Sequence, residues 1–293
     1  MKNFLSFLAI STIVLGMTSC GGNDPAGPFV INPNSENGMM PGLFTVDNEG
    51  KQVHFSQGNL QYNDSLKLWR FATNQWDTIG TANKHIGKAD YDGWIDLFGW
   101  NTGETPTKSI QSTDDYKVPF KDWGENAIAN GGNQTGWWRT PSADEWIYMI
   151  SGRVNAEKLF GLGTVAGMNG LILLPDEWEM PKDVPDFQPS TEKHLVWNGY
   201  DGYYRNTNND NFYHNTYTAE QWDTMEKAGA IFLPAAGMRT NTKVEYLTSI
   251  GYYWSATPKG EYNAYNLLFD WFRLWPLYGL AYRYAGESVR LVR

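Results

Sequence analysis

The sequence predicts an α+β domain in which two short helices pack on short antiparallel sheets joined by long loops. Three observations support this fold class. The 293 residues include 30 glycines, which favour turns over long helices. Alternating apolar and polar residues mark several short strands, and only two segments carry a helix-start signature. We expect a single domain at 41–293, with a β-rich N-terminal part at 41–135 and a core at 136–293.

The first 40 residues predict export and anchoring. Residues 1–19 begin with a basic side chain, Lys2, and continue into an apolar run too short to span a bilayer comfortably. The run ends at Cys20 in the sequence MTSC, which resembles a bacterial lipobox, and the resemblance implies that Cys20 carries a lipid. An ordinary signal peptide with an incidental cysteine is the alternative. Residues 20–40 are rich in Gly, Pro, Asn and Ser, and we expect a flexible tether there.

The composition excludes several classes of function. Cys20 is the only cysteine, so the mature domain has no intrachain disulfide, cysteine nucleophile or cysteine zinc site. The net charge of −9 and the lack of a Lys/Arg cluster argue against nucleic acid as a partner. None of the 4 histidines has the spacing of a zinc hydrolase, and no GxSxG motif occurs. We therefore expect no cofactor, no metal and no catalytic residue, although a carboxylate-based hydrolase stays open.

Short strands are expected in the N-terminal part. Residues 51–56 and 69–71 alternate between apolar and polar side chains, and 63–65 are typical of a turn. Residues 91–103 predict a loop rich in Gly, Trp and Asp. Three acids in or beside this loop could hold a hard cation, but their spacing matches no calcium loop and we interpret them as turn caps: Asp90, Asp92 and Asp96.

Two capping boxes predict the helices. Ser142 and Glu145 start the first, and it should end after about ten residues, near Gly152. The second should occupy 218–228 and stop at Gly229. Buried strands are expected at 171–174 after a turn at 169–170, and at 231–237, 252–255 and 286–292. The polar, irregular residues between 181 and 211 predict a long loop or an insertion.

The C-terminal stretch 251–293 is the candidate binding segment. Nine of the 24 residues from 261 to 284 are aromatic, against 15% in the whole chain. Alternation places Leu267 and Phe269 toward the core and the residues between and after them on the opposite face. Pro276 cannot lie in a central strand, so we expect 271–276 to form a loop or an edge. We predict that the following side chains contact a ligand: Tyr262, Tyr265, Leu268, Asp270, Trp271, Phe272, Arg273, Trp275, Tyr278, Tyr282 and Tyr284.

Three segments resemble known families: WRTPSADEWIY at 138–148, FLPAAGMR at 232–239, and GYYWSAT at 251–257 with GESVRLV at 286–292. The first is similar to a helix start in the formylglycine-generating-enzyme branch of the C-type-lectin-like fold. The others look like the Fibrobacter succinogenes major paralogous domain of Bacteroides-group lipoproteins. The front half fits that group less specifically, through FSQGNLQY at 55–62 and GWIDLFGW at 93–100. The resemblance implies a C-type-lectin-like fold in an outer-membrane lipoprotein, on the cell surface or the periplasmic face.

The chain departs from these relatives in its chemistry. Formylglycine-generating enzymes oxidise their substrate with a cysteine pair, which this domain lacks, so that activity is not carried over. The Glu-Pro-Asn and Trp-Asn-Asp calcium motifs of sugar-binding C-type lectins are absent as well. The resemblance therefore implies the fold without the enzyme activity and without calcium-dependent sugar binding.

The final segment also resembles the variable proteins of diversity-generating retroelements, in which adenine mutagenesis of Asn codons changes ligand-facing residues. This resemblance implies a fixed core at Ala264, Leu267 and Phe269 and variation at the other predicted contacts, except that Trp271 and Trp275 need different template codons. An ordinary paralogue with an aromatic-rich final hairpin stays open. The sequence thus predicts a lipid-anchored, non-enzymatic protein that binds an unknown protein or glycan, with a glycan-binding surface lipoprotein as the main alternative.

Overall fold

The computed structural model describes residues 31–112, 116, 119–193, 195–198, 202–206 and 212–293. These residues form small, mostly antiparallel sheets with three short helices, which confirms the predicted α+β class. The predicted signal peptide at 1–19 and Cys20 lie outside the described residues. Within the described ranges, no helix has the length and apolar character needed to cross a bilayer.

Two small sheets form the N-terminal part. Their strands are β1 (Phe44–Thr45) with β2 (Gln52–Val53), and β3 (Leu60–Asn63) between β4 (Leu68–Phe71) and β5 (Trp94–Ile95). The alternating run predicted at 51–56 is only partly a strand, because Phe55 instead forms an isolated bridge with Val292. The predicted turn after Asn63 is present, and the Asn63 side chain accepts a hydrogen bond from the Leu66 amide at 2.9 Å.

The middle sheet has the order β10–β6–β7–β11. Its strands are β6 (Phe160–Val165), β7 (Met168–Leu173), β10 (Thr216–Tyr217) and β11 (Ile231–Pro234). The turn predicted at 169–170 is wrong, since Ala166 and Gly167 make the turn with φ of 48° and 83°. Gly170 lies in β7 for a different reason: a Cβ there would collide with Phe232 and the Leu233 carbonyl.

The C-terminal sheet has the order β14–β15–β16–β9–β8 and is antiparallel throughout. Its strands are β14 (Ile250–Lys259), β15 (Asn263–Asp270), β16 (Arg273–Tyr282), β9 (Tyr203–Asn206) and β8 (Leu195–Asn198). The loop predicted at 181–211 is therefore wrong in part, because it contains β8, β9 and the short helix α2 (Ser190–Lys193). A two-stranded ribbon, β12 (Met238–Thr240) with β13 (Lys243–Glu245), lies before β14 in the chain.

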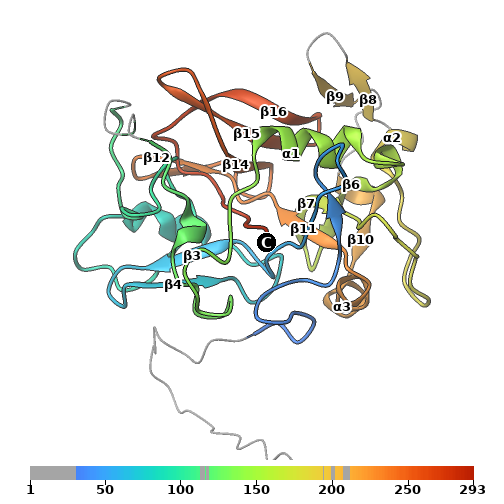
Figure 1. Cartoon of the computed structure of the whole chain (residues 1–293), viewed down its shortest axis with the longest axis horizontal. Helices are drawn as coiled ribbons and strands as arrows, with labels where there is room; N and C mark the ends of the chain where they lie inside the picture. Colours follow the sequence, from blue (N-terminus) through green and yellow to red (C-terminus); the bar gives the residue numbers. More distant parts are fainter. Residues whose placement is uncertain (1–30, 113–115, 117–118, 194, 199–201, 207–211) are drawn as a thin grey trace, which may run out of the picture.

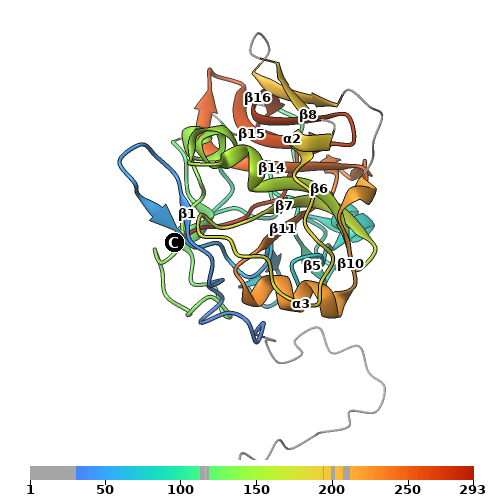
Figure 2. The ribbon, with the colours of Figure 1, turned by 90° about the vertical axis from the view of Figure 1, so that its right-hand side faces the viewer.

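Both predicted helices are present with their capping boxes. They are α1 (Ala143–Ile147), continued by a π-helical turn at Tyr148–Gly152, and α3 (Ala219–Lys227). Short 3-10 turns occupy Gly80–His85, Trp123–Glu125, Ala156–Lys158 and Phe212–His214. In Figure 2 the C-terminal sheet lies at the top, the middle sheet below it and α3 at the bottom. One core cluster includes Trp146 of α1 and Phe269 of β15, and another includes Trp222 of α3.

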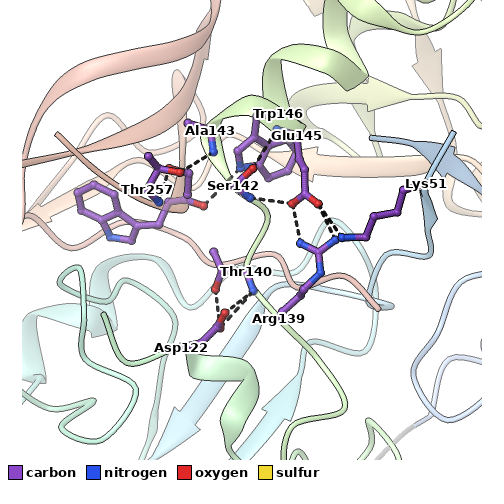
Figure 3. A network of polar contacts seen from close by, with 11 residues as sticks. Lys51, Asp122, Arg139, Thr140, Ser142, Ala143, Glu145, Trp146 and Thr257 are labelled. Carbon is purple, nitrogen blue, oxygen red and sulfur yellow. Dashed lines mark hydrogen bonds and ion pairs between the residues drawn. The ribbon is translucent and has the colours of Figure 1, made fainter. Parts of the chain in front are cut away.

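A network of polar contacts fixes the start of α1 (Figure 3). Arg139 donates through Nη2 to Glu145 Oε1 at 2.7 Å, and the Ser142 amide donates to Glu145 Oε2 at 2.8 Å. The Ala143 amide donates to Thr257 Oγ1 of β14 at 3.0 Å. The motif that carries the enzyme-like resemblance at 138–148 thus holds a helix against the C-terminal sheet.

The predicted tether does not extend to residue 40. Met40 is fully buried, and Asn32 donates through Nδ2 to Glu226 Oε2 at 3.0 Å. Asn34 donates to Asp223 Oδ1 at 2.8 Å. Residues 31–40 are therefore docked on the domain through amide–carboxylate hydrogen bonds to α3.

Residues 285–292 are buried, whereas the C-terminus, at the centre of the view in Figure 1, lies at the edge of the molecule in Figure 2. The continuous strand predicted at 286–292 is wrong, since this stretch makes isolated bridges to partners in different parts of the chain. Val292, for example, bridges both Phe55 and Arg139. The core clusters combine residues from the predicted parts 41–135 and 136–293, so no core boundary falls between them.

Candidate functional site

The final hairpin, β15–β16, has two faces with different surroundings. On the inner face Leu267 and Phe269 enter the core as predicted, together with Tyr253 of β14 and Leu274 of β16. The Phe269 ring covers Gly251, where a Cβ atom would collide with it. The inner face is therefore committed to packing, and the candidate site lies on the outer face.

Leu268 lies on the outer face, as alternation predicts, but it is buried. Its cross-strand neighbours are Tyr252 on β14 and Trp275 on β16. Only 1% of its surface is exposed, because large aromatic side chains flank it on both sides. The predicted ligand contact of Leu268 is therefore corrected: this residue forms the floor beneath Tyr252 and Trp275.

Asp270 is also buried, with 7% of its surface exposed. Its Oδ1 accepts hydrogen bonds from the amides of Phe272 at 2.8 Å and Arg273 at 2.9 Å. Its Oδ2 pairs with Arg273 Nε at 3.2 Å. The predicted ligand contact of Asp270 is corrected as well, since its carboxylate closes the turn between β15 and β16.

The loop predicted at 271–276 shrinks to the two residues Trp271 and Phe272, and the strand resumes at Arg273. Pro276 lies inside β16, where the register to β15 shifts between Asn266 and Leu268. In the described part of the chain, β9 pairs with β16 only at Arg273 and Leu274. A bulged strand with one unpaired side accepts a residue that has no N–H to donate, so the proline fits.

Partly exposed aromatic side chains gather around the β15–β16 turn and β9, and Trp271 is the most exposed of them. The ring centroids of Trp271 and Phe272 are 5.7 Å apart, and those of Trp275 and Tyr278 are 5.0 Å apart. Tyr203 of β9 lies 4.9 Å from Trp275, and the Arg205 guanidinium lies 5.2 Å from the Phe272 ring centroid. We call this set the aromatic surface: Trp271, Phe272, Trp275, Tyr278, Tyr203 and Arg205.

A pocket of about 160 Å³ adjoins the aromatic surface, and Tyr278 lines both. Its other aromatic walls are Tyr252, Tyr282 and Tyr284, and the buried Glu287 also lines it. The rings of Tyr282 and Tyr284 stack at 5.2 Å with an interplanar angle of 6°. We call this cavity the tyrosine pocket.

Besides Leu268 and Asp270, three predicted contacts belong to neither feature, and one of them, Arg273, pairs with Asp270 at 3.2 Å. Tyr262 is 47% exposed in the turn between β14 and β15, where its carbonyl accepts a hydrogen bond from the Arg283 amide at 3.1 Å. Tyr265 is half-buried, with Lys259 Nζ 5.1 Å from its ring centroid. By alternation Tyr265 shares the face of Leu267 rather than that of Trp275.

Four residues of the site escaped the sequence prediction: Tyr203, Arg205, Tyr252 and Glu287. The first two fell in the predicted loop at 181–211, where the adjacent Tyr203 and Tyr204 have strand propensity but no alternating pattern. Tyr252 was assigned to a buried strand. Glu287 carries no local signal, because only tertiary packing brings it beside Asn266.

The structure offers no evident metal centre. The described residues contain no group of three His, Cys, Asp or Glu side chains placed to hold a metal ion. Of the three acids considered for a cation, Asp96 accepts hydrogen bonds from the Ile79 amide at 2.8 Å and Asn83 Nδ2 at 2.7 Å. Burial raises the Asp96 pKa to about 6, and these hydrogen bonds oppose the rise. Asp96 is thus a structural carboxylate, as the turn-cap interpretation predicts.

Comparison with protein-family models, curated proteins and solved structures found no match. We therefore infer function from the geometry of the aromatic surface and the tyrosine pocket.

Proposed function

We propose that this chain is a lipid-anchored, non-enzymatic outer-membrane protein that binds a ligand through the aromatic surface of a C-type-lectin-like domain. The observation that carries the proposal is the position of Trp271, Phe272 and Trp275. Trp271 contacts Phe272, and Trp275 contacts Tyr203, while Phe269 of the same segment fills the core.

An aromatic surface of this kind suits binding for three physical reasons. Large rings supply contact area with few rotatable bonds, so little side-chain entropy is lost on binding. Trp, Tyr and Arg dominate measured hot spots at protein interfaces. Clustered exposed apolar side chains on a monomer usually mark an interaction site.

The ligand class is a protein, with a glycan as the alternative. The mixed aromatic and arginine composition of the aromatic surface favours a protein partner. Trp271 is 43% exposed and could also stack on a sugar ring. Diversification by a retroelement belongs to the same proposal, since Trp271, Phe272 and Arg273 lie at the hairpin turn, where a change of side chain disturbs the core least.

The anchor is tested by cell fractionation. The Cys20→Ala chain should move from the membrane fraction to the soluble fraction, whereas the wild-type chain should carry the lipid in mass spectrometry. Membrane retention of the variant, together with an unlipidated wild-type chain, would contradict the anchor.

The binding face is tested with the soluble Cys20→Ala chain on glycan arrays and on arrays of cell-surface proteins. Trp271→Ala and Trp275→Ala should each weaken binding of any captured ligand by at least about 2 kcal/mol, or about 30-fold. Tyr213→Ala is the matched control, because Tyr213 is an exposed aromatic outside the aromatic surface. Equal loss in the control, or hydrolysis of an arrayed glycan that a single carboxylate substitution abolishes, would overturn the proposal.

Diversification is tested in the surrounding DNA. A near-copy of the coding stretch for 251–293 that differs mainly at adenines, beside a reverse transcriptase gene, is the expected finding. Its absence would leave an ordinary paralogue with a fixed binding face.

A further inference from the structure

The tyrosine pocket contains a buried carboxyl group that no structural role accounts for. Glu287 is 1% exposed and lines the pocket. Asn266 donates through Nδ2 to Glu287 Oε2 at 2.7 Å. Among the described residues no Lys or Arg forms an ion pair with Glu287. Buried carboxylates are normally paired or multiply hydrogen-bonded, so this one is unusually poor in partners.

A second buried acid in the same protein provides the contrast. Asp96 has two donors on its carboxylate, and burial raises its pKa only to about 6. Burial raises the pKa of Glu287 to about 8, against the single hydrogen bond from Asn266. The neighbouring Arg239, whose backbone bridges Gly286, does not compensate it, because its side chain donates to the Leu97 carbonyl and Ser109.

The walls of the pocket are as distinctive as its acid. Tyr252, Tyr278, Tyr282 and Tyr284 surround a space to which Met238 and Thr240 also contribute. Ring faces carry negative electrostatic potential and attract cations, most strongly where water is excluded. No Lys or Arg lines the pocket, so an anion would meet only repulsion or an uncompensated loss of hydration.

We propose that the tyrosine pocket binds an organic ammonium group, with the tyrosine rings around the cation and the Glu287 carboxylate as its counter-ion. The inference rests on the proposed ligand-binding function and names the chemistry of one part of the ligand. The ammonium belongs to a lysine side chain of a protein ligand or to a small free amine. The pocket volume of about 160 Å³ corresponds to about five waters of liquid, which suits a head group rather than a whole ligand.

Glu287 should lose its proton when the ammonium group binds. Near neutral pH the free pocket holds the carboxyl largely in its protonated form, and an arriving cation favours the carboxylate, so a proton leaves to solvent. Of the groups around Glu287, burial and the Glu287 carboxylate raise the pKa of Tyr252, and burial lowers the pKa of Arg239, whose backbone bridges Gly286, only to about 10. Proton release therefore reports on Glu287.

The experiment uses the soluble full-length Cys20→Ala chain and titration calorimetry in buffers of different ionisation enthalpy. Choline and tetramethylammonium should bind, and 3,3-dimethyl-1-butanol, the uncharged isostere of choline, should bind at least about 10-fold more weakly. Glu287→Gln and Tyr282→Ala should each lose at least about 10-fold in choline affinity, and Glu287→Gln should abolish proton release. If Nα-acetyl-lysine methylamide binds as tightly as choline, the natural ammonium group belongs to a lysine of a protein ligand. If it binds more weakly, the natural ligand is a free amine.

Controls separate this inference from the proposed function. Trp271→Ala and Tyr213→Ala should leave choline binding unchanged. Three results would overturn the ammonium site. The first is binding of the neutral isostere or of methyl glycosides in place of the ammonium probes. The others are no binding of any ammonium probe and an unchanged choline affinity in Glu287→Gln. If the ammonium site fails in this way while Trp271→Ala still weakens an arrayed ligand, the aromatic surface stands as the binding face. A circular dichroism spectrum and cooperative unfolding establish that each variant is folded.

Discussion

The two central hairpins, β6–β7 and β15–β16, are both rich in apolar residues but are covered to different extents. β6–β7 packs on one side against the core that contains Trp146 and on the other against the core that contains Trp222 of α3. β15–β16 has a continuous core on its inner face, and its outer face joins a second core around Ala264 and Ala281, against which Tyr278 also packs. The rest of that outer face carries the aromatic surface and the tyrosine pocket.

The difference shows that aromatic content alone does not separate a core from a binding face. β6–β7 carries one aromatic residue, Phe160, and is buried almost throughout. In the other hairpin Phe269 is fully buried whereas Trp271, two residues later, is 43% exposed. Coverage of both faces by neighbouring elements decides which aromatic side chains are available to a ligand.

The largest effect is expected from a substitution that removes packing on the inner face of β15–β16. Phe269→Ala should lower the free energy of unfolding by about 3–5 kcal/mol, because it removes a fully buried ring and opens a cavity above Gly251. Phe269→Leu, which retains most of the volume, is the control and should cost less. Urea unfolding monitored by tryptophan fluorescence measures both, and a loss below about 1 kcal/mol in Phe269→Ala would contradict the assignment of this face to the core.

A smaller effect is expected where α1 is held against the same inner face. Glu145→Ala should destabilise the domain by about 1–3 kcal/mol, since it removes the capping box and the partner of Arg139. Glu145→Gln retains the cap and should cost less.

The stabilisation that Glu145 provides should decrease as the pH falls. Burial raises the Glu145 pKa, but hydrogen bonds from Arg139 and Ser142 outweigh burial and hold it below its ordinary value of 4.5. The contribution is therefore present above the unfolded-state pKa and is lost as the pH falls through the folded-state pKa. The stability difference between wild type and Glu145→Ala should shrink from about pH 7 to about pH 3, and a constant difference would contradict the ion-pair assignment.

Local signals in the sequence predicted the inner face well. Both capping boxes formed where Ser142 and Thr218 predicted them, because a cap depends on residues within one helical turn. The burial of Leu267 and Phe269 followed from strand alternation, which needs only the neighbouring residues.

The outer face was harder to predict because it is assembled from distant segments. The strand β9 reaches β16 across about seventy residues of sequence, and its short polar surroundings gave no strand pattern. Pro276 led to the prediction of a loop or an edge, which is wrong, because a bulge keeps this residue within the interior strand β16. Leu268 and Asp270 were placed on the correct face, yet alternation cannot reveal which neighbours cover a residue.

The next prediction concerns Glu287, which is buried like a core residue but lines the tyrosine pocket. Because burial raises the Glu287 pKa to about 8, from 4.5, the folded state binds more protons than the unfolded state between these values. The protonated Glu287 therefore contributes fully to the free energy of unfolding below the unfolded-state pKa, and this contribution is lost as the pH rises toward about 8. Relative to Glu287→Gln, the wild-type melting temperature should fall between about pH 5 and pH 8. Parallel pH profiles for the two chains would contradict a buried, proton-binding Glu287.

The smallest expected effects lie on the outer face itself. Tyr282 is 53% exposed and Trp271 is 43% exposed, so Tyr282→Ala and Trp271→Ala each remove little buried surface. We expect each to change the free energy of unfolding by less than about 1 kcal/mol, close to the value for the control Tyr213→Ala. The same variants are expected to weaken binding strongly, Trp271→Ala at the aromatic surface and Tyr282→Ala in the tyrosine pocket. A loss of stability comparable to that of Phe269→Ala would mean that these rings pack as core, and the two faces of the hairpin would then no longer differ in role.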